Sequence, residues 1–287
     1  MNTYRDNRSG CEYYLEHDRI MLHMKLDLPE GLILKQGPEE PDRERPFCPE
    51  VISADRGESR KCPLVIVQHG FTGHMEEDHI IAMAKALNET GFATLRTELY
   101  GHGKSGGAFV DHTLFKWLSE MLAIIDYAKA LDFVDDLFLC GHSQGGLAVI
   151  LAGAMKRDVI RAILPISPAV TIPDDARKGS MLEYSFDPDH VPDVLIMKDG
   201  LRLGGNHIRV SQTICVEAAI DAFSKDVLII HGDEDETVPV QAGVDAAKRY
   251  RHAQLKLVHG ADHCFNGHTD EMAGALKEYM KRFRQPA

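Results

Sequence analysis

From Pro63 onward, short runs of hydrophobic residues alternate with longer stretches in which hydrophobic residues recur every three or four positions. The short runs predict buried strands, and the longer stretches predict amphipathic helices. This alternation is typical of an α/β fold, with a mostly parallel central sheet flanked by helices. The predicted strands are 64–68, 93–97, 137–140, 162–166, 227–230 and 255–258, and the predicted helices are about 76–90, 113–131, 144–156, 240–250 and 269–284.

Three segments depart from this alternation within a single predicted domain, 1–287. Residues 12–28 alternate apolar and polar side chains in two runs, which predicts a leading antiparallel hairpin. Residues 29–61 are polar and contain several prolines, so we expect a surface excursion that contributes little to the core. Residues 168–222 lie between two late strands and carry turn residues and apolar groups of their own, which predicts an inserted cap (lid) subdomain.

The charge limits the classes of partner. The chain has 44 acidic and 32 basic residues, which gives a formal net charge of −12. Such a surface repels phosphate backbones and anionic lipid headgroups, so we expect neither nucleic acid nor a membrane as a partner. No apolar run approaches the roughly 20 residues that span a bilayer. Residues 1–6 lack the apolar stretch of a secretory signal, so we expect a cytoplasmic protein.

The cysteines and histidines do not form a known metal-binding motif. The six cysteines are scattered without a Cys-x-x-Cys pair, which favours free thiols in a reducing compartment. No His-Glu-x-x-His pattern occurs. The spacing of His69, His74 and His79 does not keep them on one face of a helix. We therefore expect no metal site.

The strongest chemical signal is the sequence Gly-His-Ser-Gln-Gly at 141–145, which directly follows a predicted strand and precedes an apolar helix. This is the Gly-x-Ser-x-Gly nucleophile elbow of the α/β-hydrolase fold in its strand–turn–helix context. Glycines are required there because the sharp turn forces strained backbone angles and close approach between elements. The turn would present the hydroxyl of Ser143, as nucleophile, at the carboxyl edge of the sheet.

A serine hydroxyl needs a neighbouring base, and in this fold the chain order is serine, acid, histidine. The loop after the fifth predicted strand contains four acidic residues, of which Asp235 is best placed and Asp233 is the main alternative. In the loop after the last strand, His263 can reach over the strand ends, whereas we expect His259 to pack near its strand. The predicted triad is therefore Ser143, Asp235 and His263.

Hydrolysis through an acyl intermediate also needs N–H donors for the developing oxyanion. The backbone amide of Gln144, directly after the nucleophile, is one predicted donor. The other is Phe71, in the His-Gly-Phe-Thr-Gly loop after the first predicted strand, and its ring would form the floor of the acyl pocket. The turn 100–107 contains Gly-Lys-Ser but lacks the preceding spacing of a Walker phosphate loop, so we interpret it as a connection at the sheet's edge.

From Pro63 to the C-terminus, the chain resembles the cinnamoyl (feruloyl) esterases of gut and rumen bacteria, in the α/β-hydrolase superfamily. Besides the motifs above, the resemblance rests on Asp-His-Thr-Leu-Phe-Lys-Trp-Leu at 111–118, Ser-Pro-Ala at 167–169 and Phe-Asp-Pro at 186–188. It implies a serine esterase that hydrolyses feruloyl, p-coumaroyl or caffeoyl esters through an acyl-enzyme, without a cofactor. It also implies the same triad and the same two oxyanion donors.

In that family the cap contacts the phenol ring of the substrate. Here Tyr184 and Phe186 are the aromatic residues of the cap, and Asp175 and His207 are its candidates for binding a phenol hydroxyl. We therefore expect a small phenolic ester as the partner. A general carboxylesterase, thioesterase or small peptidase with the same triad is the alternative. The sequence leaves the natural ester and the oligomeric state open, a homodimer included.

Overall fold

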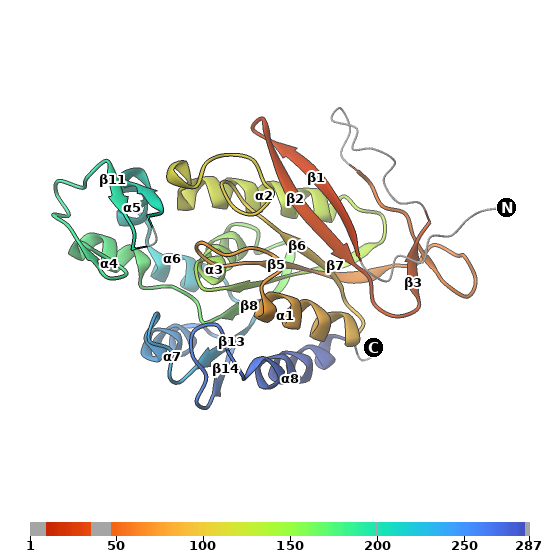
Figure 1. Cartoon of the computed structure of the whole chain (residues 1–287). Helices are drawn as coiled ribbons and strands as arrows, with labels where there is room; N and C mark the ends of the chain where they lie inside the picture. The colour runs from red at the N-terminus through yellow and green to blue at the C-terminus, as the bar shows by residue number, and fades with distance from the viewer. Residues whose placement is uncertain (1–9, 36–46, 199, 285–287) are drawn as a thin grey trace.

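An eight-stranded sheet runs through the computed structural model, which describes residues 10–35, 47–198 and 200–284 (Figure 1). The first two strands form an antiparallel hairpin, and the second of them pairs antiparallel with β6. All other neighbouring strands are parallel, so the predicted α/β class is confirmed. In their order across the sheet, the strands are β1 (Cys11–His17), β2 (Ile20–Asp27), β6 (Ala93–Thr97), β5 (Cys62–Gln68), β7 (Val134–His142), β8 (Ile160–Ile166), β13 (Asp226–Gly232) and β14 (Ala253–Val258).

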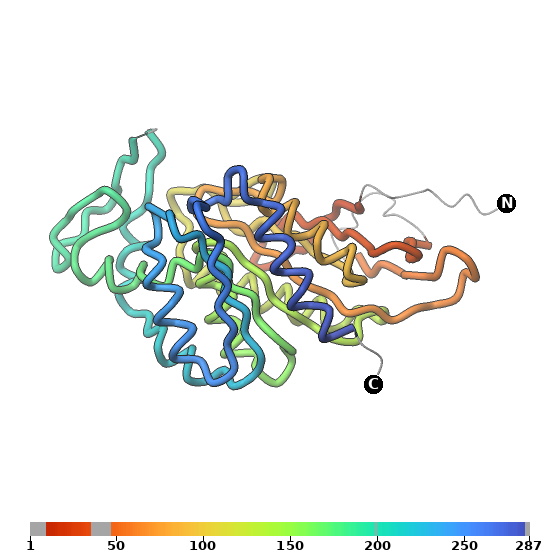
Figure 2. Tube along the Cα trace, turned by 90° about the horizontal axis from the view of Figure 1, so that it is seen from below, coloured from red at the N-terminus to blue at the C-terminus, as the bar shows by residue number. Residues whose placement is uncertain are grey.

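Helices cover both faces of the sheet, which explains why its central strands are continuous apolar runs. On one face, α2, α3 and α6 pack against the sheet in a large hydrophobic cluster that includes Trp117. On the other face, α1 and α8 lie side by side (Figure 1, Figure 2). The helices are α1 (Asp78–Glu89), α2 (Leu114–Lys129), α3 (Gln144–Met155), α6 (Val216–Ala222), α7 (Val240–Arg249) and α8 (Thr269–Met280).

The segment 29–61 contributes more to the core than its polar composition predicted. Its two ends pair as β3 (Leu32–Leu34) and β4 (Val51–Ser53), and Leu34 and Val51 are buried in the main hydrophobic cluster. Strand pairing brings together a few apolar residues that are far apart in the sequence, which periodicity alone does not reveal. Residues 36–46 of this segment, and residues 1–9 at the N-terminus, lie outside the described residues.

The segment between β8 and β13 leaves the sheet at the carboxyl end of β8. Most of it forms a separate small unit at one end of the molecule (Figure 1). The last helix of this segment, α6, instead packs against α3. The sheet and the helices that cover it are called the body of the molecule, and the small unit is called the cap. The other elements are α4 (Ile172–Lys178), β9 (Ser180–Met181), β10 (Tyr184–Ser185), β11 (Val194–Ile196), β12 (Arg202–Gly204) and α5 (Gly205–Gln212).

The cap unit has a small apolar cluster of its own. Ala176, Met181, Leu203 and Ile208 are buried in it, and Phe71 of the body packs against it. Phe109, which precedes α2, packs against the same cluster, so the cap contacts the rest of the domain at two loops. Among the described residues, no helix combines the length and the apolar character that crossing a bilayer requires.

Candidate active site

Ser143 stands between the last residue of β7 and the first residue of α3 in a strained turn. Its φ of 56° and ψ of −121° lie in a region that residues with a side chain rarely adopt. The surrounding backbone holds this geometry, because the Ser143 amide donates to the carbonyl of Ile166 at 2.9 Å. A Cβ atom at Gly145 would lie 2.2 Å from the carbonyl oxygen of His69, so only glycine fits there.

The structure brings the three predicted triad residues together in one hydrogen-bonded chain. Nε2 of His263 lies 2.9 Å from Oγ of Ser143, and its Nδ1 lies 2.7 Å from Oδ2 of Asp235. With Nδ1–H donating to the carboxylate, Nε2 is free to accept the hydroxyl proton of Ser143. This is the arrangement of a nucleophile, a base and a group that orients the base.

The carboxylate of Asp235 is buried and fully bonded. Its Oδ1 accepts the backbone N–H groups of Thr237 and Val238 at 2.9 and 2.8 Å, and its Oδ2 also lies 3.1 Å from Nε2 of His231. Burial alone would raise the pKa of Asp235, but the hydrogen bonds from His231 and His263 outweigh it and hold that pKa well below its ordinary value. The carboxylate is therefore ionised at neutral pH.

Asp233 and His259, the alternatives to Asp235 and His263, form a hydrogen-bonded pair away from Ser143. Nδ1 of His259 lies 2.8 Å from Oδ2 of Asp233, and the His259 side chain is 95% exposed. The expectation that His259 packs near its strand is therefore wrong. Because β14 is the edge strand of the sheet, the residue that follows its end faces solvent.

The two predicted oxyanion donors, Phe71 and Gln144, belong to two segments that meet at Ser143. Gln144 is the first residue of α3, where a backbone N–H has no partner within the helix. Phe71 follows Gly70, whose backbone passes so close that an added Cβ would lie 3.0 Å from Cβ of Ser143. Two N–H groups at these positions can hold a negatively charged oxygen next to the serine.

The ring of Phe71 lies in an aromatic cluster between the body and the cap. Its ring centroid is 5.3 Å from that of Phe109, 5.5 Å from His112 and 5.8 Å from His207. His207, a predicted candidate for binding a phenol hydroxyl, is fully buried, and burial lowers its pKa to about 3. In the structure the ring of His207 packs against that of Phe71, and its contact with a phenol hydroxyl stays a prediction.

The other three predicted substrate contacts, Asp175, Tyr184 and Phe186, are half-buried residues of the cap. Phe186 packs against the same apolar cluster as Phe71. Asp175 belongs to α4, and Tyr184 belongs to the short strand β10. Asp175 and Tyr184 retain partial access to solvent, but the hydroxyl oxygen of Tyr184 is buried, and their contacts with a substrate stay predictions.

Two histidines that support the triad were not predicted. Nε2 of the buried His142 donates to the backbone carbonyl of His263 at 2.8 Å, which anchors the loop of the base. His231 bonds the carboxylate of Asp235. The only sequence signal for either residue was its position, since His142 directly precedes the nucleophile and His231 is the second-last residue of the strand before the acid.

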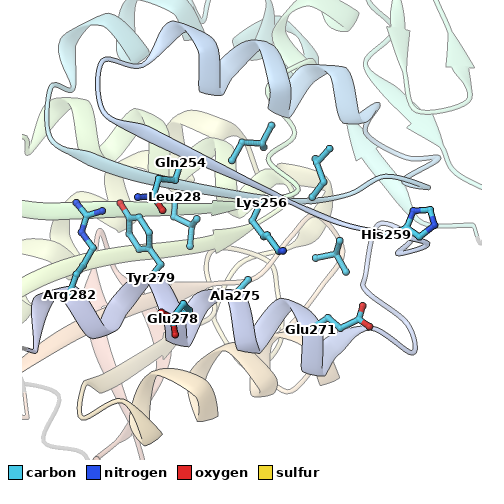
Figure 3. Close-up of a pocket in the computed structure, with 12 residues that line it drawn as sticks. Leu228, Gln254, Lys256, His259, Glu271, Ala275, Glu278, Tyr279 and Arg282 are labelled. Carbon is cyan, nitrogen blue, oxygen red and sulfur yellow. The ribbon is translucent and has the colours of Figure 1, made fainter.

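A surface cavity of about 830 Å³ lies elsewhere, between β14 and α8 (Figure 3). Its lining includes Leu228, Lys256, Glu271 and Tyr279, and none of the triad residues. Its position on the outer edge of the sheet separates it from the elbow. We therefore do not assign the hydrolytic chemistry to this cavity.

Known structures resemble more than nine tenths of the chain. Est1E from Butyrivibrio proteoclasticus, in its structure with bound ferulic acid, is 48% identical, covers 93% of this chain and 97% of its own, and has a TM-score of 0.82. Mouse alpha/beta hydrolase domain-containing protein 10 is 17% identical, with 95% and 99% of the two chains covered and a TM-score of 0.70, which shows the fold.

Curated relatives are more distant. The mouse palmitoyl-protein thioesterase ABHD10 is 23% identical over 66% of this chain and 64% of its own length. Human protein ABHD12B is 24% identical over 63% of this chain and 48% of its own length, so the chain spans about half to two thirds of these relatives. Residues 59–204 match the family model described as serine aminopeptidase, S33. The chain belongs to this family of α/β-fold serine hydrolases, and within the fold it is similar to Est1E.

Proposed function

We propose that this protein is a serine esterase that hydrolyses esters of hydroxycinnamic acids. The observation that carries the hydrolytic chemistry is the continuous chain of hydrogen bonds from Asp235 through His263 to Ser143 at a strained elbow. The observation that supports a hydroxycinnamoyl acyl group is the 48% identity to Est1E, whose structure has been solved with bound ferulic acid.

In the first half of the reaction, Oγ of Ser143 attacks the ester carbonyl carbon while Nε2 of His263 takes the hydroxyl proton. The carbonyl oxygen becomes negatively charged and accepts the N–H groups of Phe71 and Gln144. The ionised Asp235 stabilises the imidazolium that forms. When the tetrahedral intermediate collapses, the alcohol leaves with the proton from His263, and the acyl group stays on the serine.

In the second half, a water molecule replaces the alcohol. His263 takes a proton from the water, whose oxygen attacks the acyl carbon of the acyl-enzyme. The same two amides hold the second oxyanion. Collapse returns the proton to Oγ of Ser143 and releases the carboxylic acid, so that the enzyme is restored.

The apolar cluster beside Phe71 favours a planar aromatic acyl group. Phe71, Phe109 and Phe186 all pack against the small core of the cap. An aromatic ring buried against such side chains is stabilised by a few kcal/mol, at about 25 cal/mol per Å² of apolar area. Only part of this free energy has to be realised in the transition state for the enzyme to prefer aromatic acyl groups, because about 1.36 kcal/mol corresponds to a tenfold rate difference.

The test is the ratio of kcat/KM values for methyl ferulate and methyl butyrate. The proposal predicts a ratio of at least about tenfold in favour of methyl ferulate. Methyl p-coumarate serves as a matched control, because it keeps the planar aryl-propenoyl group and lacks only the methoxy group. Equal or faster hydrolysis of methyl butyrate would contradict the proposed acyl preference while leaving the hydrolase chemistry in place.

A second candidate uses the same triad on another acyl compound. The names of the relatives point to thioesterase and aminopeptidase chemistry. Palmitoyl-coenzyme A and an aminoacyl p-nitroanilide, measured beside methyl ferulate, separate these activities. A higher kcat/KM for either of them than for methyl ferulate would replace the esterase proposal.

A further inference from the structure

Three potential metal ligands lie together behind the catalytic base. They are His79 of α1, His142 at the end of β7 and Cys264 in the loop after β14. One ligand atom from each lies within 4.8 Å of the others. The rings of His79 and His142 are 4.3 Å apart, and the ring of His142 is 4.7 Å from that of His263.

One member of this group has a buried nitrogen that the fold does not explain. Nε2 of His79 has no hydrogen-bond partner among the described residues, although the residue is only 4% exposed. Buried polar atoms normally have a hydrogen-bond partner, and an atom without one is open to a water molecule or an ion. Oε2 of Glu77 lies 3.9 Å from this nitrogen, which is too far for a hydrogen bond.

We propose that His79, His142 and Cys264 bind a divalent cation of the zinc class. Two imidazoles and a thiolate are the donors that Zn²⁺ prefers, whereas Mg²⁺ and Ca²⁺ require oxygen ligands. Ligand atoms around a tetrahedral zinc lie about 3.3 to 3.8 Å apart, so the three atoms need to close by about 1 Å. Binding releases the thiol proton of Cys264 to solvent, and water or the carboxylate of Glu77 fills the fourth position.

The position of the site couples metal binding to catalysis. His142 precedes the nucleophile and donates Nε2–H to the carbonyl of His263, and Cys264 is bonded directly to His263 in the chain. A cation bound by His142 and Cys264 would draw these two residues together. Because both of them contact or adjoin His263, the position of the catalytic imidazole would change. We therefore expect the bound cation to inhibit hydrolysis. The binding itself does not depend on the proposed acyl specificity.

The test is calorimetric titration of the full, reduced and chelator-treated chain with ZnCl₂, and with MgCl₂ as the control cation. We expect one zinc per chain with a dissociation constant below about 10 µM and no binding of magnesium. His79→Leu and Cys264→Ser should each weaken zinc binding by at least about tenfold. The matched controls, His190→Leu and Cys215→Ser, change exposed residues of the same types and should leave the affinity unchanged.

A second readout requires no variant. Co²⁺ in place of zinc should give the near-ultraviolet charge-transfer band of a thiolate–cobalt bond, and zinc should displace it. At saturating zinc, wild-type turnover should fall at least about tenfold, and His79→Leu should keep its turnover. The proposal is overturned if no thiolate–cobalt band appears, if the wild type binds no zinc, or if His79→Leu binds zinc as tightly as the wild type. Equal zinc inhibition in His79→Leu would also overturn it, because the cation would then act at the triad itself.

Discussion

At the residue scale, the chemistry depends on one side chain held in a backbone conformation that costs free energy. The φ of 56° at Ser143 persists because β7, α3 and the backbone of Ile166 fix the turn. Replacing Ser143 with alanine removes only the hydroxyl oxygen. Ser143→Ala should therefore keep the fold, as measured by circular dichroism, and should lower kcat by about 10⁴-fold or more. A variant that retains a tenth of the wild-type kcat would remove Ser143 from the mechanism.

The two acidic residues Asp233 and Asp235 provide a matched pair for the role of the acid. Asp235 contacts the imidazole of His263, whereas Asp233 contacts that of His259 at the surface. An amide at position 235 cannot stabilise the imidazolium, so Asp235→Asn should lower kcat by about 10³- to 10⁴-fold. Asp233→Asn should change kcat less than about twofold, because surface substitutions have small effects. If Asp233→Asn proves the more damaging of the two, the assignment of the acid is wrong.

At the element scale, the sequence predicted the existence of the six parallel strands and five long helices, and the structure extends or trims most of them by a few residues. Those elements are defined by local periodicity, which a single chain displays directly. The triad could be predicted for a related reason, since Ser143, Asp235 and His263 each follow a predicted strand. The burial of His207 and the contact between His142 and His263 could not be predicted, because they depend on packing between elements that are distant in the sequence.

The start of α2 offers a test of an individual element. Thr113 is its N-cap, and its side chain accepts the backbone N–H of Lys116 at 3.2 Å. Thr113→Ala removes this bond and should lower the free energy of unfolding by about 1 kcal/mol. Thr171 is also a helix N-cap, at α4, but makes no such bond. Thr171→Ala should therefore change stability by less than about 0.5 kcal/mol in the same urea titration. Equal losses in the two variants would show that the capping bond does not stabilise α2.

At the scale of the whole molecule, buried neutral histidines should make the fold sensitive to acid. Burial lowers the pKa of His69 and His207 to about 3, and that of His79 and His102 to about 4. In the unfolded chain an imidazole has a pKa of about 6.5. Between these values the unfolded state binds more protons, so the free energy of unfolding falls as the pH falls. Glu120 acts in the opposite direction, because burial raises its pKa to about 7 and the folded state takes up its proton first.

The loss of stability from protonating these four histidines is larger than the gain from protonating Glu120. The free energy of unfolding should therefore decrease by at least about 3 kcal/mol between pH 7.5 and pH 5. Urea unfolding of the metal-free chain, followed by the fluorescence of the single, buried Trp117, measures this change. His207→Leu should make the pH dependence shallower, and His190→Leu, at an exposed site, should not. A stability that is constant over this range would contradict the neutral state of the buried imidazoles.

The role of Ser143 as nucleophile is tested most directly by identifying the residue that carries the acyl group during turnover. An activated aryl ester of ferulic acid makes acylation faster than deacylation, so that the acyl-enzyme accumulates and can be quenched in acid. Peptide mass spectrometry should then find one feruloyl group, on the peptide that contains Ser143, and none in the Ser143→Ala variant. Hydrolysis of the ester without a feruloyl group on the protein, or with that group on another residue, would show that Ser143 is not the nucleophile.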